Sequence, residues 1–146
     1  MPKMMRSLNV ISRCQSLYRS AQLQGDLCGT QHAFVLAICH TPGRSQEELA
    51  RRLCLNKSTV ARALTQLEDN GYVLRQPNPE DKRQLLVYPT QKMTDALVRV
   101  REISEEWSRQ ICRGIDAREL EIFESVLYRM EAGARALAQG EGEVEE

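Results

Sequence analysis

The chain has 146 residues, of which 42% are hydrophobic and 27% are charged, a composition that is ordinary for a soluble globular protein. Its length suits one domain with a sizeable core and is too short for two domains of usual size. No apolar run approaches the roughly 20 residues that span a bilayer, and no signal-peptide segment follows the first residues. We therefore expect a cytoplasmic protein with no membrane partner.

The formal net charge is zero, but the charges are unevenly distributed. Residues 1–43 carry a net charge of +3, residues 44–94 carry +3 and residues 95–146 carry −6. A basic region beside an acidic one fits a chain that meets nucleic-acid phosphates at one end only. The same distribution also fits solvated helix faces that bind nothing.

The cysteines and histidines do not form a recognisable metal or disulfide pattern. An odd number of cysteines cannot form a closed disulfide framework, and none of the five stands in a CxxC motif. They are Cys14, Cys28, Cys39, Cys54 and Cys112. With only two histidines in addition, no zinc-type constellation is visible. We expect reduced thiols, no metal and no cofactor.

The first third of the chain predicts two helices. Residues from about 4 to 24 lack glycine and proline and form a loosely amphipathic pattern that indicates a helix. The segment from Gly25 to Gly29 breaks it, and Thr30 is expected to cap the next helix. That helix is apolar enough to lie in the core, and it ends at Thr41-Pro42-Gly43.

A helix-turn-helix pattern follows. Ser45 has a carboxylate three residues later, at Glu48, which is the capping-box pattern and predicts a helix beginning at Gln46. Cys54 and Leu55 are expected to form the turn. The second helix would then begin directly after the turn.

The second helix is predicted to have one apolar and one polar face. Asn56 can cap it, and Asn70-Gly71 can end it. Val60, Leu64 and Leu67 recur at helical spacing on the inward face. The polar residues expected to contact DNA from this helix are Asn56, Lys57, Ser58, Thr59, Arg62, Thr65 and Gln66. An arginine such as Arg62 can make a bidentate contact to guanine in the major groove.

Two β-prone runs, Tyr72–Arg75 and Leu85–Tyr88, predict a hairpin wing around a proline-rich turn. The hairpin tip would carry Asp81, Lys82 and Arg83. An arginine on a narrow ribbon suits the negative potential of the minor groove, and Asp81 could orient it through a charge-assisted hydrogen bond. Arg75 would either contact a phosphate beside the wing or be solvated.

The remainder predicts two more helices. Thr90 is expected to cap a long helix with an apolar stripe from Met93 to Ile111, and Asp116 begins a second one after Gly114. The near-heptad spacing of the stripe predicts that it packs against a partner helix. We expect a homodimer, whose two-fold symmetry would place two recognition helices roughly 34 Å apart on a palindrome. The alternative is an intramolecular bundle within a monomer.

Four segments resemble the MarR family of bacterial winged helix-turn-helix transcriptional regulators. Pro42–Ala50 is similar to the start of that family's reading head, and Asn56–Arg62 resembles its recognition helix. Leu67–Val73 is similar to the helix exit, and Pro79–Arg83 to the wing. One departure is Met93, at a position where the family often has glycine.

The resemblance implies a mainly α fold with a small β-hairpin wing, in a single domain over residues 1–146. Dimerisation helices would span 1–29 and 93–139 and interleave in an obligate homodimer. The winged helix-turn-helix would span 30–92, and 140–146 would form a disordered acidic tail. By position, the resemblance assigns Asp81 and Arg83 to the wing pair that reaches the minor groove. It assigns Ser58, Thr59 and Arg62 to groove contacts.

The resemblance leaves the signal open. Some members bind small phenolic or anionic effectors in a crevice between the dimer module and the reading head. Others sense organic hydroperoxides with a first-helix cysteine near tyrosines, and Cys14 and Tyr18 lie four residues apart on one helical face. The alternative for Cys14 is a small helix residue with no redox role. His32 would line the crevice or be a surface or hydrogen-bonded residue, and Trp107 would belong to the dimer core rather than to a ligand platform.

The function predicted is a sequence-specific regulator that binds double-stranded DNA, a homodimeric repressor released by a small molecule or an oxidant. The alternative is a winged-helix protein-interaction module that does not bind DNA. No nucleophile with a base, phosphate loop or paired-carboxylate pocket stands out, so we do not expect an enzyme.

Overall fold

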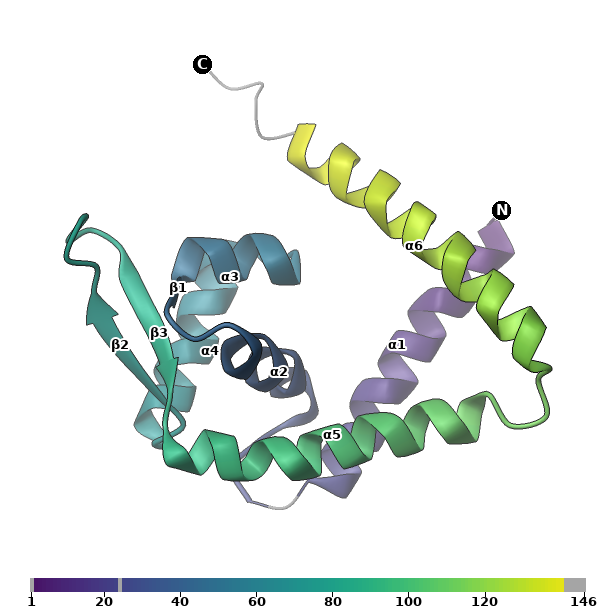
Figure 1. Cartoon of the computed structure of the whole chain (residues 1–146), viewed down its shortest axis with the longest axis horizontal. Helices are drawn as coiled ribbons and strands as arrows, with labels where there is room; N and C mark the ends of the chain where they lie inside the picture. Colours follow the sequence, from purple (N-terminus) through teal and green to yellow (C-terminus); the bar gives the residue numbers. More distant parts are fainter. Residues whose placement is uncertain (1, 24, 141–146) are drawn as a thin grey trace. The chain divides into compact units, whose positions relative to one another are not determined.

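The computed structural model describes residues 2–23 and 25–140, and it is mainly helical with a small antiparallel sheet (Figure 1). This confirms the predicted fold class. The chain divides into two compact units, Met1–Trp107 and Ser108–Glu146. Residues 141–146, and with them nearly all of the predicted acidic tail, lie outside the described residues. In the described part of the chain, no helix is long and apolar enough to cross a membrane.

Most elements belong to the first unit. In chain order they are α1 (Pro2–Gln22), the 3-10 helix η1 (Gly29–Gln31), α2 (His32–His40), β1 (Arg44–Ser45), α3 (Gln46–Leu53), α4 (Lys57–Asp69), β2 (Val73–Pro77), β3 (Leu85–Pro89) and α5 (Gln91–Ile111). The last turn of α5 passes into the second unit, which also contains α6 (Ala117–Gly140).

The helix-turn-helix forms as its local signals predict. The Ser45 hydroxyl oxygen accepts from the Glu48 backbone N–H at 3.2 Å and caps α3. Cys54 ends that helix in the left-handed conformation, with φ at +52°. The Asn56 side-chain oxygen accepts from the Thr59 backbone N–H at 2.8 Å and caps α4. In each helix, the capping side chain therefore satisfies one of the N–H groups that the first turn leaves without an intrahelical partner.

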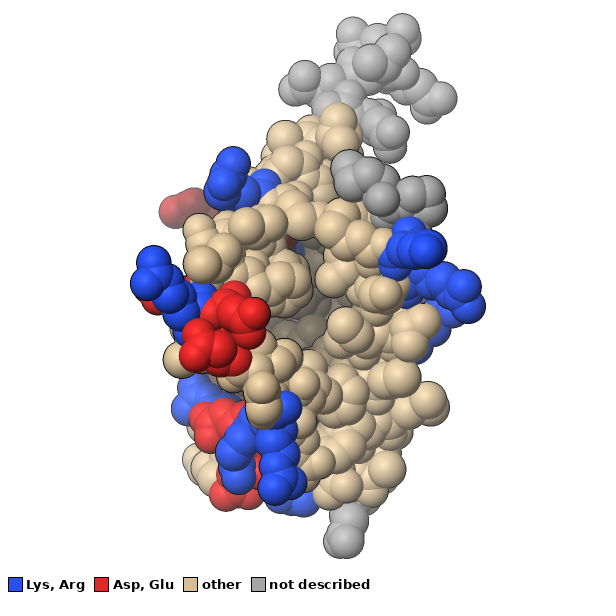
Figure 2. Space-filling model, turned by 90° about the vertical axis from the view of Figure 1, so that its right-hand side faces the viewer, with Lys and Arg blue, Asp and Glu red and all other residues tan. Residues whose placement is uncertain are grey.

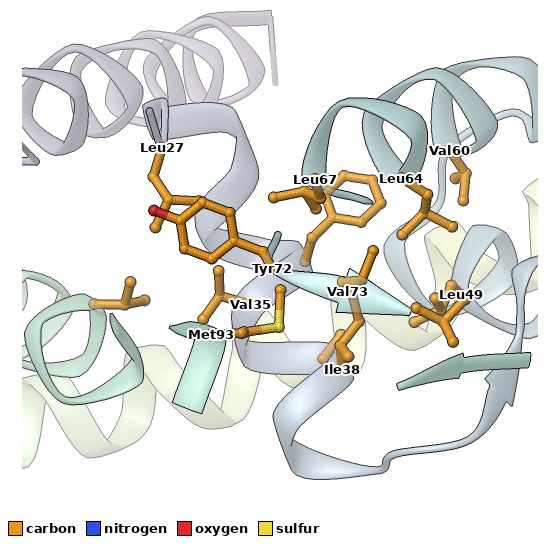
Figure 3. Packing of buried hydrophobic residues seen from close by; sticks show 14 of the residues in the cluster. Leu27, Val35, Ile38, Leu49, Val60, Leu64, Leu67, Tyr72, Val73 and Met93 are labelled. Carbon is orange, nitrogen blue, oxygen red and sulfur yellow. The ribbon is translucent and has the colours of Figure 1, made fainter. Parts of the chain in front are cut away.

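A hydrophobic core holds α4 against the rest of the first unit. Val60, Leu64 and Leu67 are fully buried, which confirms the predicted inward face. Figure 3 shows the side chains of Leu27, Tyr72 and Met93, from three segments far apart in sequence, gathered in this core. Because such close packing leaves few voids, the rotation of α4 about its own axis is fixed.

The sheet has the order β1-β3-β2, and both pairings are antiparallel. Strands β2 and β3 form the predicted hairpin, which extends beyond the helices (Figure 1). Strand β1 was not predicted, because two residues are too few to produce an alternating pattern. Its residues Arg44 and Ser45 pair with Val87 and Leu86 and join the root of the wing to the start of α3.

The predicted cap of the second helix is wrong. Thr30 lies inside η1, and α2 begins only at His32. The Gln31 side chain instead reaches back and accepts from the Cys28 backbone N–H at 3.1 Å. The Thr30 hydroxyl lies 3.0 Å from the Cys28 sulfur. A short 3-10 turn therefore occupies the place where sequence alone indicated a simple helix start.

His32 is buried rather than at the surface. Its side chain is 1% exposed, and neither ring nitrogen has a hydrogen-bond partner among the described residues. Burial, together with the positive charge of Arg19, lowers the pKa of His32 to about 4. Both causes disfavour the protonated ring. The surface interpretation of this histidine is therefore wrong.

The second unit exposes much of its apolar surface. Asp116 accepts from the Arg118 backbone N–H at 2.9 Å and so caps α6, as predicted. Several large apolar side chains of this helix are exposed: Ile122, Phe123, Val126, Tyr128 and Leu137. Figure 2 shows one face of the molecule, on which residues other than Lys, Arg, Asp and Glu predominate.

We predict that the titration of His32 makes the protein less stable in mild acid. Because the folded-state pKa of His32 lies below the usual value, the neutral ring makes its full contribution to the free energy of unfolding above pH about 6.5. This contribution is lost as the pH falls towards 4. The loss should reach about 3 kcal/mol in the free energy of unfolding. Urea unfolding between pH 4 and 7 would measure it.

His32→Leu should remove this part of the pH dependence, whereas His40→Leu, at an exposed position of α2, should keep it. Parallel pH profiles for the wild type and His32→Leu would contradict the prediction.

Candidate nucleic-acid interface

The outer face of α4 is polar and accessible. Ser58, Arg62, Thr65 and Gln66 are exposed on the side opposite the buried apolar residues, and Lys57 is exposed at the first position of the helix. Thr59 is half-buried, and Asn56 is exposed just before the helix. The fold therefore brings the predicted residues of this helix to one surface. That they contact DNA stays a prediction.

The residues at the start of α4 are partly engaged with each other. The Asn56 side-chain oxygen accepts from the Ser58 hydroxyl at 2.9 Å as well as from the Thr59 N–H. Asn56 is therefore first a helix cap, and the hydroxyl of Ser58 must rotate to donate to a base. Lys57 and Arg62 are exposed cations whose charge can reach phosphate or guanine.

The later residues of the α4 face are tied to the scaffold. The Gln66 side-chain oxygen accepts from the Gln31 amide at 3.3 Å. The Thr65 hydroxyl donates to the Ala61 carbonyl at 2.9 Å and accepts from Arg75 at 3.2 Å. These contacts hold both side chains in place, so the first turns of α4 carry the more adaptable groups.

Arg75 connects the wing strand β2 to α4 through hydrogen bonds. It bridges β2 to Glu68 through its Nε and Nη2 atoms at 3.3 and 3.1 Å. Its Nη1 donates to the Gln46 side-chain oxygen at 3.1 Å. The side chain is only 16% exposed, so the prediction that Arg75 is solvated is wrong. The structure does not place it with the exposed cations of α4.

The Arg75 contacts also perturb Glu68. Hydrogen bonds from Arg75 are the main cause that lowers the pKa of Glu68, and they outweigh its partial burial. A charged carboxylate is thus favoured at the point where α4 meets β2. Sequence reasoning missed this pair, although Glu68 lies in the predicted helix exit, Leu67–Val73, and Arg75 two residues after it.

The wing tip presents a cation. Arg83 is 96% exposed, and its backbone N–H donates to the Asp81 carboxylate at 3.1 Å. The Arg83 Nε lies 3.7 Å from the same oxygen, which is an ion pair rather than the predicted hydrogen bond. Lys82 is exposed beside them. Asn78, which sequence reasoning did not single out, shapes the turn by accepting from the Glu80 N–H at 3.0 Å.

The candidate redox pair is not isolated from the rest of the chain. Cys14 is exposed on α1, whereas the ring of Tyr18 packs against Trp107 of α5, with ring centroids 5.3 Å apart. Trp107 therefore has a partner within its own chain. Among the described residues, no group of His, Cys, Asp and Glu could hold a metal ion.

Comparisons with known proteins agree with the fold described above. The model of the MarR family matches residues 30–85, from η1 into the start of β3. Over these residues the chain is similar to the MarR family. The HTH-type transcriptional regulator YybA of Bacillus subtilis is 25% identical over 131 residues, which are 89% of this chain and 87% of YybA.

Two solved MarR-family structures match nearly the whole chain. A MarR transcriptional regulator from Methanosarcina mazei Go1 is 26% identical, with a TM-score of 0.85 over 93% of this chain and 99% of that one. A MarR family transcriptional regulator from Listeria monocytogenes, solved in complex with 26mer DNA, has a TM-score of 0.87 at 22% identity. It covers 97% of this chain and 95% of its own, and shows a shared fold.

The contacts of Arg75 with Glu68, Gln46 and Thr65 predict a loss of stability on conservative substitution. Arg75→Lys keeps the charge but cannot span Glu68, Gln46 and Thr65 at once. Because the Glu68 side chain is about a third exposed, we expect a modest loss, about 1 kcal/mol, in the free energy of unfolding. Urea unfolding would measure it, with Arg113→Lys, at an exposed position, as the control. Equal midpoints for the two variants would refute the prediction.

Proposed function

We propose that this DNA-binding transcriptional regulator acts as a homodimeric repressor on a palindromic site in double-stranded DNA and is released by a small anionic or phenolic effector. The observation that carries the DNA-reading part is the orientation of α4. Its apolar side is fully buried, its polar side with Arg62 is exposed, and Lys57 is exposed at its first position. A helix held in this way can enter the major groove with its base-reading side outward.

The wing would supply the second contact to DNA. Arg83 at its tip is almost fully exposed, and the strands behind it are paired along five residues each. An arginine carried by a narrow ribbon fits the minor groove, where the potential is most negative. The Listeria protein of the same fold was solved with DNA, which supports DNA binding by a chain of this fold. No apolar or acidic surface replaces these groups on α4, so a protein-interaction module is the weaker candidate.

The dimer is proposed from the apolar surface of α6. Ile122, Phe123 and Leu137 are each more than half exposed, which is costly for side chains of this size in water. A second copy of the same helix would cover them. Two-fold symmetry would then separate two reading heads by about one turn of DNA, and a dimer on such a site would block it to other proteins.

The DNA-reading proposal predicts different losses for two cations of α4. Arg62→Ala should weaken binding to the preferred duplex by about 1 to 3 kcal/mol and relax base preference, because it removes a bidentate contact. Lys57→Ala should weaken all duplexes alike and reduce the salt dependence, because it removes a phosphate contact. Titration of duplexes selected from genomic DNA would measure both losses.

The double variant Arg62→Ala, Arg83→Ala should lose binding through both grooves. Arg101→Ala, on the exposed side of α5 outside the reading head, should bind as the wild type does. Unchanged affinity of the double variant for the selected duplex would overturn the proposed function.

The effector proposal rests on a pocket of about 410 Å³ in the first unit. It is lined by Gln22, Leu23, Leu27, Tyr72, Ala96 and Arg99. The volume suits a small ligand, the apolar lining suits an aromatic ring, and Arg99 supplies a positive charge. An exposed Cys14 on α1 is the basis of the competing oxidant signal.

Two treatments would separate these signals. Benzoate should release DNA from the wild type and phenol less so, because Arg99 attracts the carboxylate; Arg99→Gln should lose the difference, and Arg101→Gln should keep it. If the Cys14 thiol is not the sensor, peroxide should release DNA from Cys14→Ser to the same extent as from the wild type. Release by peroxide that depends on Cys14, with no response to benzoate, would replace the effector proposal by the redox one.

A further inference from the structure

Thr90, which follows the hairpin, holds the root of the wing, Gly71 and Tyr72, through hydrogen bonds. Between the end of α4 and the start of β2, the Gly71 carbonyl accepts from the Thr90 hydroxyl at 2.6 Å. The Tyr72 carbonyl accepts from the same hydroxyl at 3.0 Å and from the Thr90 N–H at 2.9 Å. Thr90 lies at its predicted position before α5, and its hydroxyl donates back towards the wing root.

A three-residue cluster, Asp26–Tyr72–Lys92, adds to this anchorage. The Tyr72 hydroxyl donates to one carboxylate oxygen of Asp26 at 2.6 Å. The Lys92 ammonium donates to the other at 3.0 Å and to the Asn70 carbonyl, at the end of α4, at 2.6 Å. The same ammonium lies 4.3 Å from the centroid of the Tyr72 ring. The cluster joins the segment before η1, the end of α4 and the start of α5.

The protonation states in the cluster reinforce one another. Hydrogen bonds from Tyr72 and Lys92 lower the pKa of Asp26, so the carboxylate stays charged. Burial and the Asp26 carboxylate raise the pKa of Tyr72 to about 12, so the phenol keeps the proton that it donates. Near neutral pH, every donor therefore has its acceptor.

We propose that Asp26 is a positioning residue for the wing, acting through Tyr72 and Lys92. Tyr72 is the residue between the helix stop at Gly71 and the first wing residue Val73, and its ring is buried in the core. The hydrogen bonds that fix the hydroxyl and the carbonyl of Tyr72 also fix the direction in which β2 leaves the end of α4. Asp26 belongs to none of the exposed groups proposed to touch DNA, so its effect on binding is indirect.

The partial exposure of the ion pair decides which effect to expect. The Lys92 and Asp26 side chains are 48% and 42% exposed, and exposed pairs add little to global stability. Removing the Asp26 charge should therefore leave the fold intact and loosen the wing root locally. This expectation separates positioning from a merely stabilising contact.

Amide hydrogen exchange of the protein without DNA tests the proposal directly. In Asp26→Asn and in Lys92→Gln, the amides of Tyr72 and Thr90 should exchange about tenfold faster, while that of Ile38 in α2 stays within about twofold of the wild type. Asp69→Asn, which removes one carboxylate from the exposed end of α4 outside the cluster, should leave all three rates unchanged. Unchanged rates at Tyr72 and Thr90 in Asp26→Asn, or equal increases at all three amides, would overturn the proposal.

The consequence for binding rests on the proposed function and is measured separately. On a selected duplex, Asp26→Asn should lose the minor-groove hydroxyl-radical protection assigned to the wing and keep the protection of guanine N7 in the major groove. Equal loss of both, or of neither, would count against a positioning role. If the wild type binds no duplex, the proposed function fails, while the exchange rates still decide whether Asp26 positions the wing.

Discussion

The orientation of α4 is the constraint on which the rest of the head depends. Burial of Val60, Leu64 and Leu67 fixes which side of the helix points outward. Since neighbouring helical positions differ by about 100°, that choice also fixes the exposure of Ser58 and Arg62. The caps at Ser45 and Asn56 set where the two helices begin, but the core determines what the second one presents.

The wing is held to this helix by polar contacts as well as by the core, to which Val73 of β2 and Val87 of β3 belong. Arg75 ties β2 to Glu68 of α4, and Thr90 ties the wing root to the start of α5. Tyr72 contributes to the core, the small pocket and the contact with Asp26. A perturbation at this one residue can therefore reach the wing without any change at the groups proposed to contact DNA.

Local signals explain what the sequence predicted correctly. The caps at Ser45 and Asn56, the apolar spacing in α4 and the turn chemistry of the wing each act within a few residues, so they could be recognised without a structure. The missed features depend on distant contacts. Arg75 donates to Gln46 at the start of α3, 29 residues away, and His32 is buried by packing that its own neighbours do not reveal. The short strand β1 exists only because β3 lies beside it.

We propose that a dimer holds two winged helix-turn-helix segments at one spacing, so that they bind one palindrome together. Affinity for the selected duplex should be compared with affinity for the same duplex carrying five extra base pairs between its half-sites. Half a turn would move the second half-site to the opposite face of the DNA, so we predict a loss of more than about tenfold. Equal affinity for the two duplexes would contradict the account.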